Sequence, residues 1–465
     1  MKKYAFIIAA LSACLTVSCN KELSNDETVT PQVTMKTVTI TATIDDEIDE
    51  STKTSYSNTG VFSWTSGDQI SVLGDDGNTY TFTANSTGVT STFTGTMPDG
   101  VGLGARAHFP ADSGHDIAGY KYCIPSSKDI SAHVSADIPM VGVKDDTKYN
   151  FAHCCGATQL TIDNIPSKFV KVQITVSHPS LKLSGTFSIF TSGSYYKWNA
   201  NTAANDAEKT YVRTVAVSDN KASIYIPYGS GDEWWGTNTV SVIGYDSADN
   251  PTTLLSDKAM KSIGAVARAH IKPLKPLGLD RLAFIDWSAG GIQTFAGNGT
   301  DNNYGERIIQ WKVDYDSYYL YFYYTLTKSK IKYDSESGSY ASSQSRIYIG
   351  LDLNNDPATG SDASFAGLPA DSGWEATVEV RPWSGTTEGS PEIVSGTNAS
   401  SYIDRPVGTT LGAKVAQIGS FDASYAYLGI SIPRSALGAI SSTINVQHEM
   451  QWGYYTSKES VSITD

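Results

Sequence analysis

The chain has 465 residues, too many for one ordinary hydrophobic core, and this length predicts two or three domains. A formal net charge of −14 with no basic stripe argues against any nucleic-acid partner, because such a surface repels phosphate backbones. Only 18 % of the residues are charged while 11 % are aromatic, which favours half-buried β-strands over helices.

The first residues, MKKYAFIIAALSACLTVSC, have the pattern of an export signal. Lys2 and Lys3 precede an apolar segment, residues 4–17, that is too short to span a bilayer. The LTVSC sequence that ends at Cys19 resembles the lipobox of bacterial lipoproteins, in which the cysteine is lipidated and becomes the mature N-terminus. LSAC, which ends at Cys14, is an alternative lipobox, and cleavage elsewhere is another. We expect a signal peptide over residues 1–18 and lipidation at Cys19.

If Cys19 is lipidated, the polar residues that follow it connect the lipid to the folded domains. The polar segment 19–33 is then a flexible tether that holds the folded domains off the membrane. The sequence thus predicts an outer-membrane lipoprotein exposed on the cell surface. Export also permits disulfides, and three cysteines remain, of which one must stay unpaired. Cys123 with Cys154 or with Cys155 are the two pairings left open.

Short strands follow one another from Thr34. KTVTITATI, NTYTFTA and STFTGTM alternate apolar and polar residues and are closed by Gly, Asp or Asn, which is typical of antiparallel β-sandwiches. The Pro-rich segment KPLKPLGLD, residues 272–280, is the clearest domain boundary. We expect an all-β protein of tandem antiparallel β-sandwiches, with domains over residues 34–155, 156–275 and 280–465.

The segment TKTSYSNTGVFSWTSGDQISVL resembles the opening of the fimbrillin-like lipoproteins of Bacteroidota. The matching residues are Lys53, Thr54, Trp64, Gly67 and Asp68, and the likeness covers residues 34–273. It implies two sandwich domains of a pilus subunit or a related surface protein. In polymerising members a protease removes an N-terminal strand and a neighbour's strand fills the groove. Lys53 stands where that family has Arg at the cleavage site. Without the resemblance, Trp64 is simply a core residue and Asp68 a turn residue.

The last third carries a different pattern. RIYIGLDLNNDPATG and YLGISIPRSALG, in this order, resemble strands of the DOMON-like superfamily, which includes family-9 carbohydrate-binding modules. The likeness covers residues 282–455 and implies a jelly-roll sandwich. Relatives bind sugars, haem or nothing known, so the resemblance is weaker for the ligand than for the fold.

The loop after RIYIGLDL raises the question of a metal. Asp352, Asn354 and Asp356 have the D-x-N-x-D spacing of hard oxygen ligands, and Asp362 lies close behind them. An EF-hand needs Gly at the sixth position and Glu at the twelfth, where this chain has Pro357 and Ala363. A structural calcium of another geometry is one interpretation, and a turn stabilised by Asx and Pro residues is the preferred one.

An aromatic row is the candidate sugar site. In YYLYFYYTL one strand face is apolar, and the other face carries tyrosines. If neighbouring strands pair with this one, polar residues of theirs flank the tyrosines. Aromatic rings stack on pyranose faces, and ionic side chains bond hydroxyl groups. The candidate residues are Tyr319, Tyr321, Tyr323, Tyr348, Arg346 and Glu375. The alternative is that these tyrosines pack beneath loops or against another domain.

Trp383 lies in the polar segment RPWSGTTEGSPE and is the best single candidate for ligand contact. The sequence has no H-E-x-x-H, G-x-S-x-G or phosphate-loop motif. Glu375 and Glu379 are about 13 Å apart along a strand, too far for a glycosidase pair. We therefore expect a non-catalytic surface lipoprotein that binds a polysaccharide or host glycan through its C-terminal sandwich. The alternative is a pilus subunit or tip adhesin that polymerises.

Overall fold

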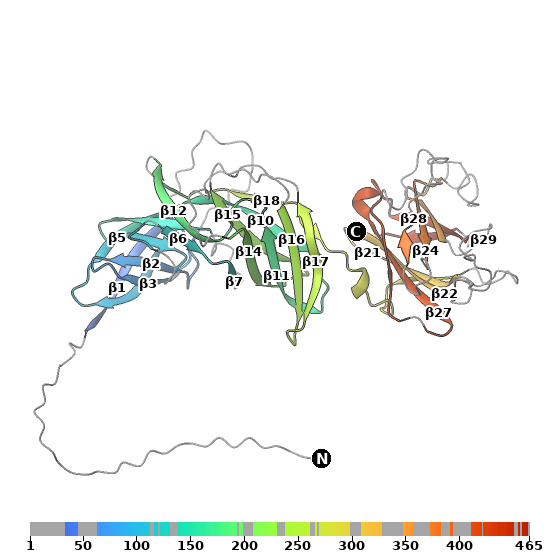
Figure 1. Cartoon of the computed structure of the whole chain (residues 1–465), viewed down its shortest axis with the longest axis horizontal. Coiled ribbons are helices and arrows are strands. Elements are labelled where there is room, and N and C mark those ends of the chain that lie inside the picture. The colour runs from blue at the N-terminus through green and yellow to red at the C-terminus, as the bar shows by residue number, and fades with distance from the viewer. Residues whose placement is uncertain are drawn as a thin grey trace, which may run out of the picture.

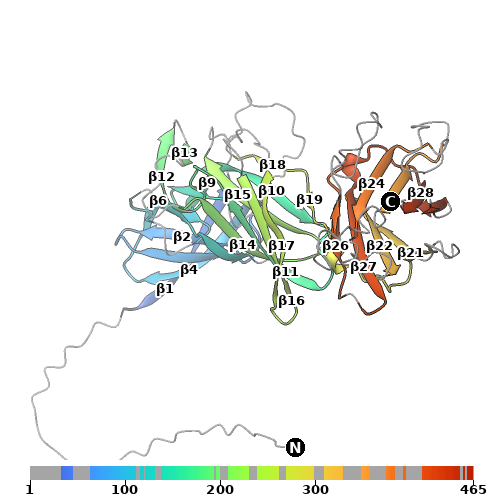
Figure 2. The same cartoon turned by 45° about the vertical axis from the view of Figure 1, so that its right-hand side comes forward.

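The structure of the chain is a computed structural model. It describes residues 33–44, 63–111, 116–119, 121–130, 138–192, 195–198, 208–229, 238–260, 266, 269–297, 308–327, 347–356, 373–382, 391–393, 411–420, 422–450, 454–455 and 458–463. Within these ranges the regular structure is β-strand apart from short 3-10 turns, so the all-β prediction is confirmed. The strands form three units that lie in a row (Figure 1), and a second view shows the same order (Figure 2).

The first unit is a barrel. Its sheet runs β1-β4-β3-β2-β5-β8-β9 and closes because β1 pairs antiparallel with β4 and parallel with β9. We expected an open sandwich here, but the parallel pairing removes both edges of the sheet and leaves no strand open to another chain. The strands are β1 Met35–Ile44, β2 Gln69–Gly74, β3 Thr79–Ala84, β4 Thr90–Pro98, β5 Leu103–Phe109, β8 Met140–Asp145 and β9 Lys148–His153.

Trp64 lies at the centre of the barrel core, as predicted. Its side chain is buried, and its ring meets Phe93, Phe109 and Phe151 edge-on at centroid distances of 5.0, 5.3 and 5.1 Å. The indole N–H donates to the carbonyl oxygen of Ala42 in β1 at 3.1 Å. One large ring therefore fills the apolar interior and satisfies its polar atom against the first strand.

Asp68 closes the turn after Trp64. Its Oδ2 accepts a hydrogen bond from the backbone N–H of Thr65 at 2.7 Å, and Gly67 adopts a φ of +95°, which side chains with a Cβ rarely adopt. The predicted turn role of Asp68 is confirmed, and this turn leads the chain into β2.

The second unit is a sandwich. The sheet β17-β16-β11-β14-β7 shares one apolar core with β15-β10-β18, whose β10 also pairs with β19, and a small sheet β13-β12-β6 lies beside them. The strands are β6 Lys121–Ile124, β7 Ser127–Ile130, β10 Cys155–Asp163, β11 Phe169–Ser177, β12 Gly185–Ser192, β13 Tyr195–Trp198, β14 Thr210–Ala216, β15 Ala222–Gly229, β16 Asn238–Asp246, β17 Pro251–Met260, β18 Ile271–Pro273 and β19 Leu277–Gly278.

The first two units exchange strands. A single boundary at residue 155, as expected from the sequence, would place β6 and β7 in the first unit. β6 and β7 pair with β12 and β14 of the second unit, and the chain then returns to the barrel as β8 and β9. Long-range pairing of this kind leaves no local mark in the sequence. The cysteine of β6 is half-buried, Cys154 and Cys155 are buried, and neither of the two disulfide pairings left open by the sequence is formed.

The third unit is a two-sheet sandwich. One sheet runs β20-β21-β22-β27-β26 and the other β25-β24-β23-β28-β29, with β30 also paired to β28. Apolar side chains of both sheets form a single core. The elements are η3 Leu282–Phe284, β20 Gln293–Ala296, β21 Ile308–Tyr315, β22 Tyr319–Thr327, β23 Ile347–Asp352, β24 Ala376–Arg381, β25 Glu392–Ile393, β26 Lys414–Gln417, β27 Tyr425–Pro433, η6 Arg434–Ala436, β28 Thr443–Met450, β29 Tyr454–Tyr455 and β30 Glu459–Ser462. Among the residues with described positions, no helix has the length and apolar character needed to cross a membrane.

Candidate functional site

The candidate site lies where the second unit meets the third. The predicted Pro-rich joint is partly strand-paired: Leu277 and Gly278 run parallel to Ile162 and Asp163 at the end of β10. Leu282, only four residues after Gly278, already packs on the outer face of the third unit. The connection is therefore short, and it brings the end of β10 close to the β21–β22 turn.

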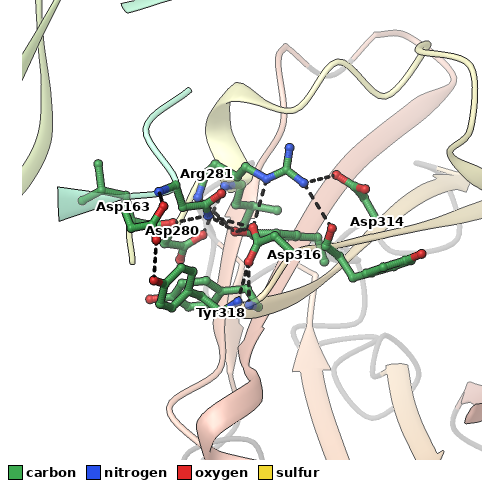
Figure 3. A network of polar contacts seen from close by, with 12 residues as sticks. Asp163, Asp280, Arg281, Asp314, Asp316 and Tyr318 are labelled. Carbon is green, nitrogen blue, oxygen red and sulfur yellow. Dashed lines mark hydrogen bonds and ion pairs between the residues drawn. The ribbon is translucent and has the colours of Figure 1, made fainter. Parts of the chain in front are cut away.

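Side chains from both units bond across this joint (Figure 3). The Tyr318 hydroxyl of the β21–β22 turn donates to Oδ2 of Asp163 at 2.7 Å, and Lys221 lies 3.2 Å from the same oxygen. Asn164, which holds a φ of +61°, donates from Nδ2 to Oδ2 of Asp316 at 2.7 Å. Burial alone would raise the pKa of Asp163, but the hydrogen bonds from Tyr318, Asn164 and Lys221 outweigh it and lower that pKa. We call this set of contacts the joint latch.

Arg281 supports the latch from the third unit. Its Nη2 lies 2.8 Å from Oδ2 of Asp314, and its Nε lies 3.0 Å from Oδ2 of Asp316 (Figure 3). Burial alone would lower the pKa of Arg281, but the two carboxylates raise it. The hydroxyl of Tyr321 donates to the same Asp316 oxygen at 2.8 Å, so the Asp316 carboxylate is held on several sides. This network fixes the turn that carries Tyr318.

A cavity of about 550 Å³ opens beside the latch, a size within the usual range for small-molecule sites. It is lined by Lys275, Pro276, Gly278, Ser317, Tyr318, Tyr319, Pro433, Arg434 and Ser435. The joint contributes the first three residues, the β21–β22 turn the next three, and the end of β27 with η6 the last three. We call this cavity the joint pocket.

The pocket combines aromatic, hydroxyl and cationic groups. Burial is the main cause that raises the pKa of both Tyr318 and Tyr319 to about 12, so both phenols keep their protons at neutral pH. Gly278 allows the Tyr318 ring to lie against the joint, because a Cβ at this position would fall 2.2 Å from Cγ of Tyr318. Arg434 is oriented by a hydrogen bond from Nη1 to the backbone oxygen of Asp316 at 2.9 Å.

The predicted aromatic row is not a single platform. β22 pairs with β21 and β27, whereas β23 and β24 belong to the opposite sheet of the sandwich. Both sheets turn their aliphatic faces to the common core, so their outer faces point away from each other. Tyr348 and Glu375 are therefore on the side of the sandwich opposite to the β22 tyrosines, and Arg346 and Trp383 lie outside the described residues.

The outer face of β22 is covered by the chain that enters the third unit. Tyr321 is fully buried there and packs with Leu282, Trp287 and its neighbours on β22. Tyr323 stacks on Trp287 at a centroid distance of 5.2 Å. The expected ligand role of Tyr321 is wrong for this reason, and the alternative of packing beneath a loop holds for Tyr321 and Tyr323. Tyr319 is half-buried and borders the joint pocket.

The loop after β23 is held by protein groups. Oδ2 of the buried Asp352 lies 3.0 Å from both Lys458 Nζ and Asn445 Nδ2, and Oδ1 accepts from the backbone N–H of Asp356 at 3.2 Å. Asn354 accepts from that N–H too, at 2.8 Å, which is an Asx turn.

The described part of the chain contains no cluster of three or more metal-ligating side chains. Asp362 lies outside it, so the calcium interpretation stays a prediction. Glu375, another predicted site residue, accepts from the backbone N–H of Leu353 at 2.7 Å and thus supports this turn.

Sequence reasoning missed Lys275, Tyr318, Arg434 and Ser435. Each stands in a segment that the sequence does single out: Lys275 in the Pro-rich joint, Tyr318 beside the tyrosine row, and Arg434 and Ser435 in the IPRSALG motif. The sequence carries no local pattern which shows that these segments meet, because the pocket is formed by three parts of the chain that are distant from one another.

No family model matches the chain, and no curated protein matches it. Among solved structures, a candidate cell adhesion protein from Bacteroides ovatus is 14 % identical, with a TM-score of 0.27, covering 53 % of this chain and 92 % of that one. A leucine-rich repeat protein from Bacteroides thetaiotaomicron is 12 % identical, with a TM-score of 0.17, covering 57 % of this chain and 30 % of that one. TM-scores this low carry no argument about this protein, so its function must be inferred from its own residues.

Proposed function

We propose that the protein is a lipid-anchored, non-catalytic adhesin of the cell surface that binds a glycan in the joint pocket. The observation that carries this proposal is the composition of the pocket. Two tyrosines, Tyr318 and Tyr319, lie beside the hydroxyl groups of Ser317 and Ser435 in a cavity of about 550 Å³. Aromatic rings that stack on a sugar and hydroxyl groups that bond to it are the groups a saccharide site needs.

The order of the units supports the same role. The described chain starts with β1 in the barrel, and the third unit lies at the opposite end of the row (Figure 1). With a lipid at Cys19, the barrel end lies nearest the membrane and the joint pocket lies farther from it. The joint latch ties the second unit to the third by a hydrogen bond from Tyr318 to Asp163 and one from Asn164 to Asp316, so the pocket walls keep their spacing.

Replacing Tyr319 by Ala is expected to weaken glycan binding roughly tenfold or more, because one stacking ring is lost from the pocket. The measurement is a glycan array with the full mature chain in detergent, followed by calorimetric titration of the glycans that bind. Tyr425→Ala is the matched control: Tyr425 is exposed and lies at the far end of the β22–β27 strand pair. Equal loss in both variants, or no binding by the intact protein, would refute a glycan site here.

A second candidate function is that of a pilus subunit, and the position of β1 favours it. β1 alone closes the barrel, by pairing with β4 and β9, and its interior side chains Ile40, Ala42 and Ile44 are buried in the core. Lys53 follows β1, in a segment outside the described residues. Cleavage there would detach β1 from the rest of the chain and leave a groove that a neighbour's strand could fill.

Treatment with a trypsin-like protease is the test of the pilus function. A pilus subunit is expected to lose β1 after cleavage at Lys53 and to form polymers that resist detergent on a gel, whereas Lys53→Gln protein stays monomeric. Cleaved protein that retains β1 and stays monomeric would rule out the pilus role and leave the adhesin.

A further inference from the structure

We infer that the joint pocket selects an anionic sugar, whose negative charge is a carboxylate or a sulfate group. This inference rests on the proposed glycan-binding function and adds the class of ligand to it. It comes from the charge of the pocket, which differs in sign from that of the whole chain.

The lining of the pocket is cationic. Lys275 and Arg434 contribute two positive charges, and none of the described lining residues is acidic. The full chain has 34 Lys and Arg against 48 Asp and Glu, which gives a net charge of −14. A cavity whose described lining has two cations and no carboxylate, in such an acidic protein, is suited to an anionic group.

The carboxylates closest to the pocket are engaged elsewhere. Asp163 accepts from Tyr318 and pairs with Lys221. Asp316 accepts the backbone N–H groups of Tyr318 and Tyr319 with Oδ1, at 2.7 and 2.9 Å, and holds Arg281 with Oδ2. Their charges are thus balanced within the protein.

Asp280 is the third carboxylate near the pocket, and its partners lie on β26 and β27. Its Oδ2 accepts from the Ser431 hydroxyl at 2.7 Å and lies 3.6 Å from Lys414 Nζ. Neither of these partners lines the pocket. The three carboxylates are therefore held by groups other than Lys275.

The two cations are prepared for a ligand in different ways. Lys275 is exposed and makes no hydrogen bond or ion pair with any described residue, so its ammonium group can turn toward an anion. Arg434 is half-buried and is oriented by the backbone oxygen of Asp316. A guanidinium held in this way presents a planar set of donors, which suits carboxylate and sulfate oxygens.

The remaining lining residues fit the body of a sugar. Tyr318 and Tyr319 supply aromatic rings, and Ser317 and Ser435 supply hydroxyl groups. Stacking alone favours any pyranose, whereas the cations favour only charged ones. The pocket should accordingly distinguish a uronic acid from its neutral methyl ester, which has nearly the same shape.

The experiment is a glycan array with neutral, uronic-acid, sialylated and sulfated glycans, on the full mature chain in detergent. Acidic glycans are expected to bind and neutral ones of equal length to bind at least about tenfold more weakly. Calorimetric titration of a bound uronic-acid glycan and of its methyl ester is expected to show the same difference. Binding should weaken as the salt concentration rises.

Two lysine variants test whether Lys275 contributes to binding of the acidic glycan. Lys275→Gln is expected to weaken binding of the acidic glycan about threefold to tenfold without affecting folding, because Lys275 is exposed and unpaired among the described residues. Lys258→Gln, a change of the same charge on an exposed lysine of β17, is expected to leave binding unchanged.

The outcomes separate the two proposals. Binding of neutral glycans or of the methyl ester with equal affinity would overturn the anionic selectivity and leave the glycan site intact. No binding of any glycan would overturn both. If only sulfated glycans or only carboxylated glycans bind, the result identifies which anion the pocket takes. If Lys275→Gln and Lys258→Gln weaken binding equally, Lys275 does not contact the anion in the pocket, and the anionic selectivity is overturned.

Discussion

Lowering the pH from 6.5 to 4.5 is expected to destabilise the third unit by about 2 kcal/mol through one residue, His448. His448 is fully buried in β28, its Nε2 is hydrogen-bonded to the Tyr324 hydroxyl at 2.7 Å, and its ring lies 4.5 Å from that of Trp311. Burial lowers the pKa of His448 to about 3 and raises that of Tyr324. The folded state therefore cannot take up the proton that the unfolded chain accepts near pH 6.5.

The depressed pKa of His448 determines the direction in which stability changes with pH. Stability from neutral His448 is complete above pH 6.5 and falls progressively as the pH drops toward 3. The measurement is scanning calorimetry of the full chain at pH 7.5, 6.5, 5.5 and 4.5. His448→Gln keeps a polar partner for Tyr324 but takes up no proton, so its transition should move much less over this range. A third-unit transition that shifts equally in both proteins would show that other groups cause the acid sensitivity.

Removing Lys458 is expected to cost about 3–5 kcal/mol, since it leaves the charge of Asp352 buried without its cation. The Asp352 side chain is 0 % exposed and that of Lys458 31 %. Lys458 also lies 5.5 Å from the centroid of the Trp374 ring, so the ammonium is held against the apolar core. Urea unfolding of Lys458→Met protein, compared with the intact chain, measures this loss.

Asp352→Asn in the Lys458→Met background is the control. It removes the buried charge but keeps only one of the two oxygens that accept from Asn445 and from the backbone of Asp356, so part of the lost stability should return. The calcium interpretation predicts a different pattern: calcium would stabilise the intact protein, and more strongly once Lys458 is gone. Stabilisation by calcium, or a Lys458→Met protein as stable as the intact one, would contradict a lysine-paired turn.

Strand periodicity predicted the core of the third unit well. Leu320, Phe322, Tyr324 and Leu326 of β22 are fully buried, as alternation requires. Trp311 and Trp374 are fully buried too. Alternation is a local property of an extended chain, so the residues themselves encode which side of each strand faces inward.

The site was harder to predict because it is formed by contacts between distant segments. The outer face of β22 looked open, yet Leu282 and Trp287 cover Tyr321. Only the sheet partners of β22 and β23 show that Tyr348 belongs to the opposite side of the sandwich. Pairing partners depend on the topology of the whole unit, which a periodic pattern does not record.

The sequence by itself determined that this protein is all-β, that Trp64 is a core residue and that Asp68 closes a turn. These features follow from alternation, side-chain volume and turn chemistry, which act over a few neighbouring residues. The tertiary structure decided the strand exchange between the first two units, the burial of Tyr321, the Lys458 partner of Asp352 and the joint pocket. Each of these depends on which distant segments meet, and that is set by packing of the complete chain.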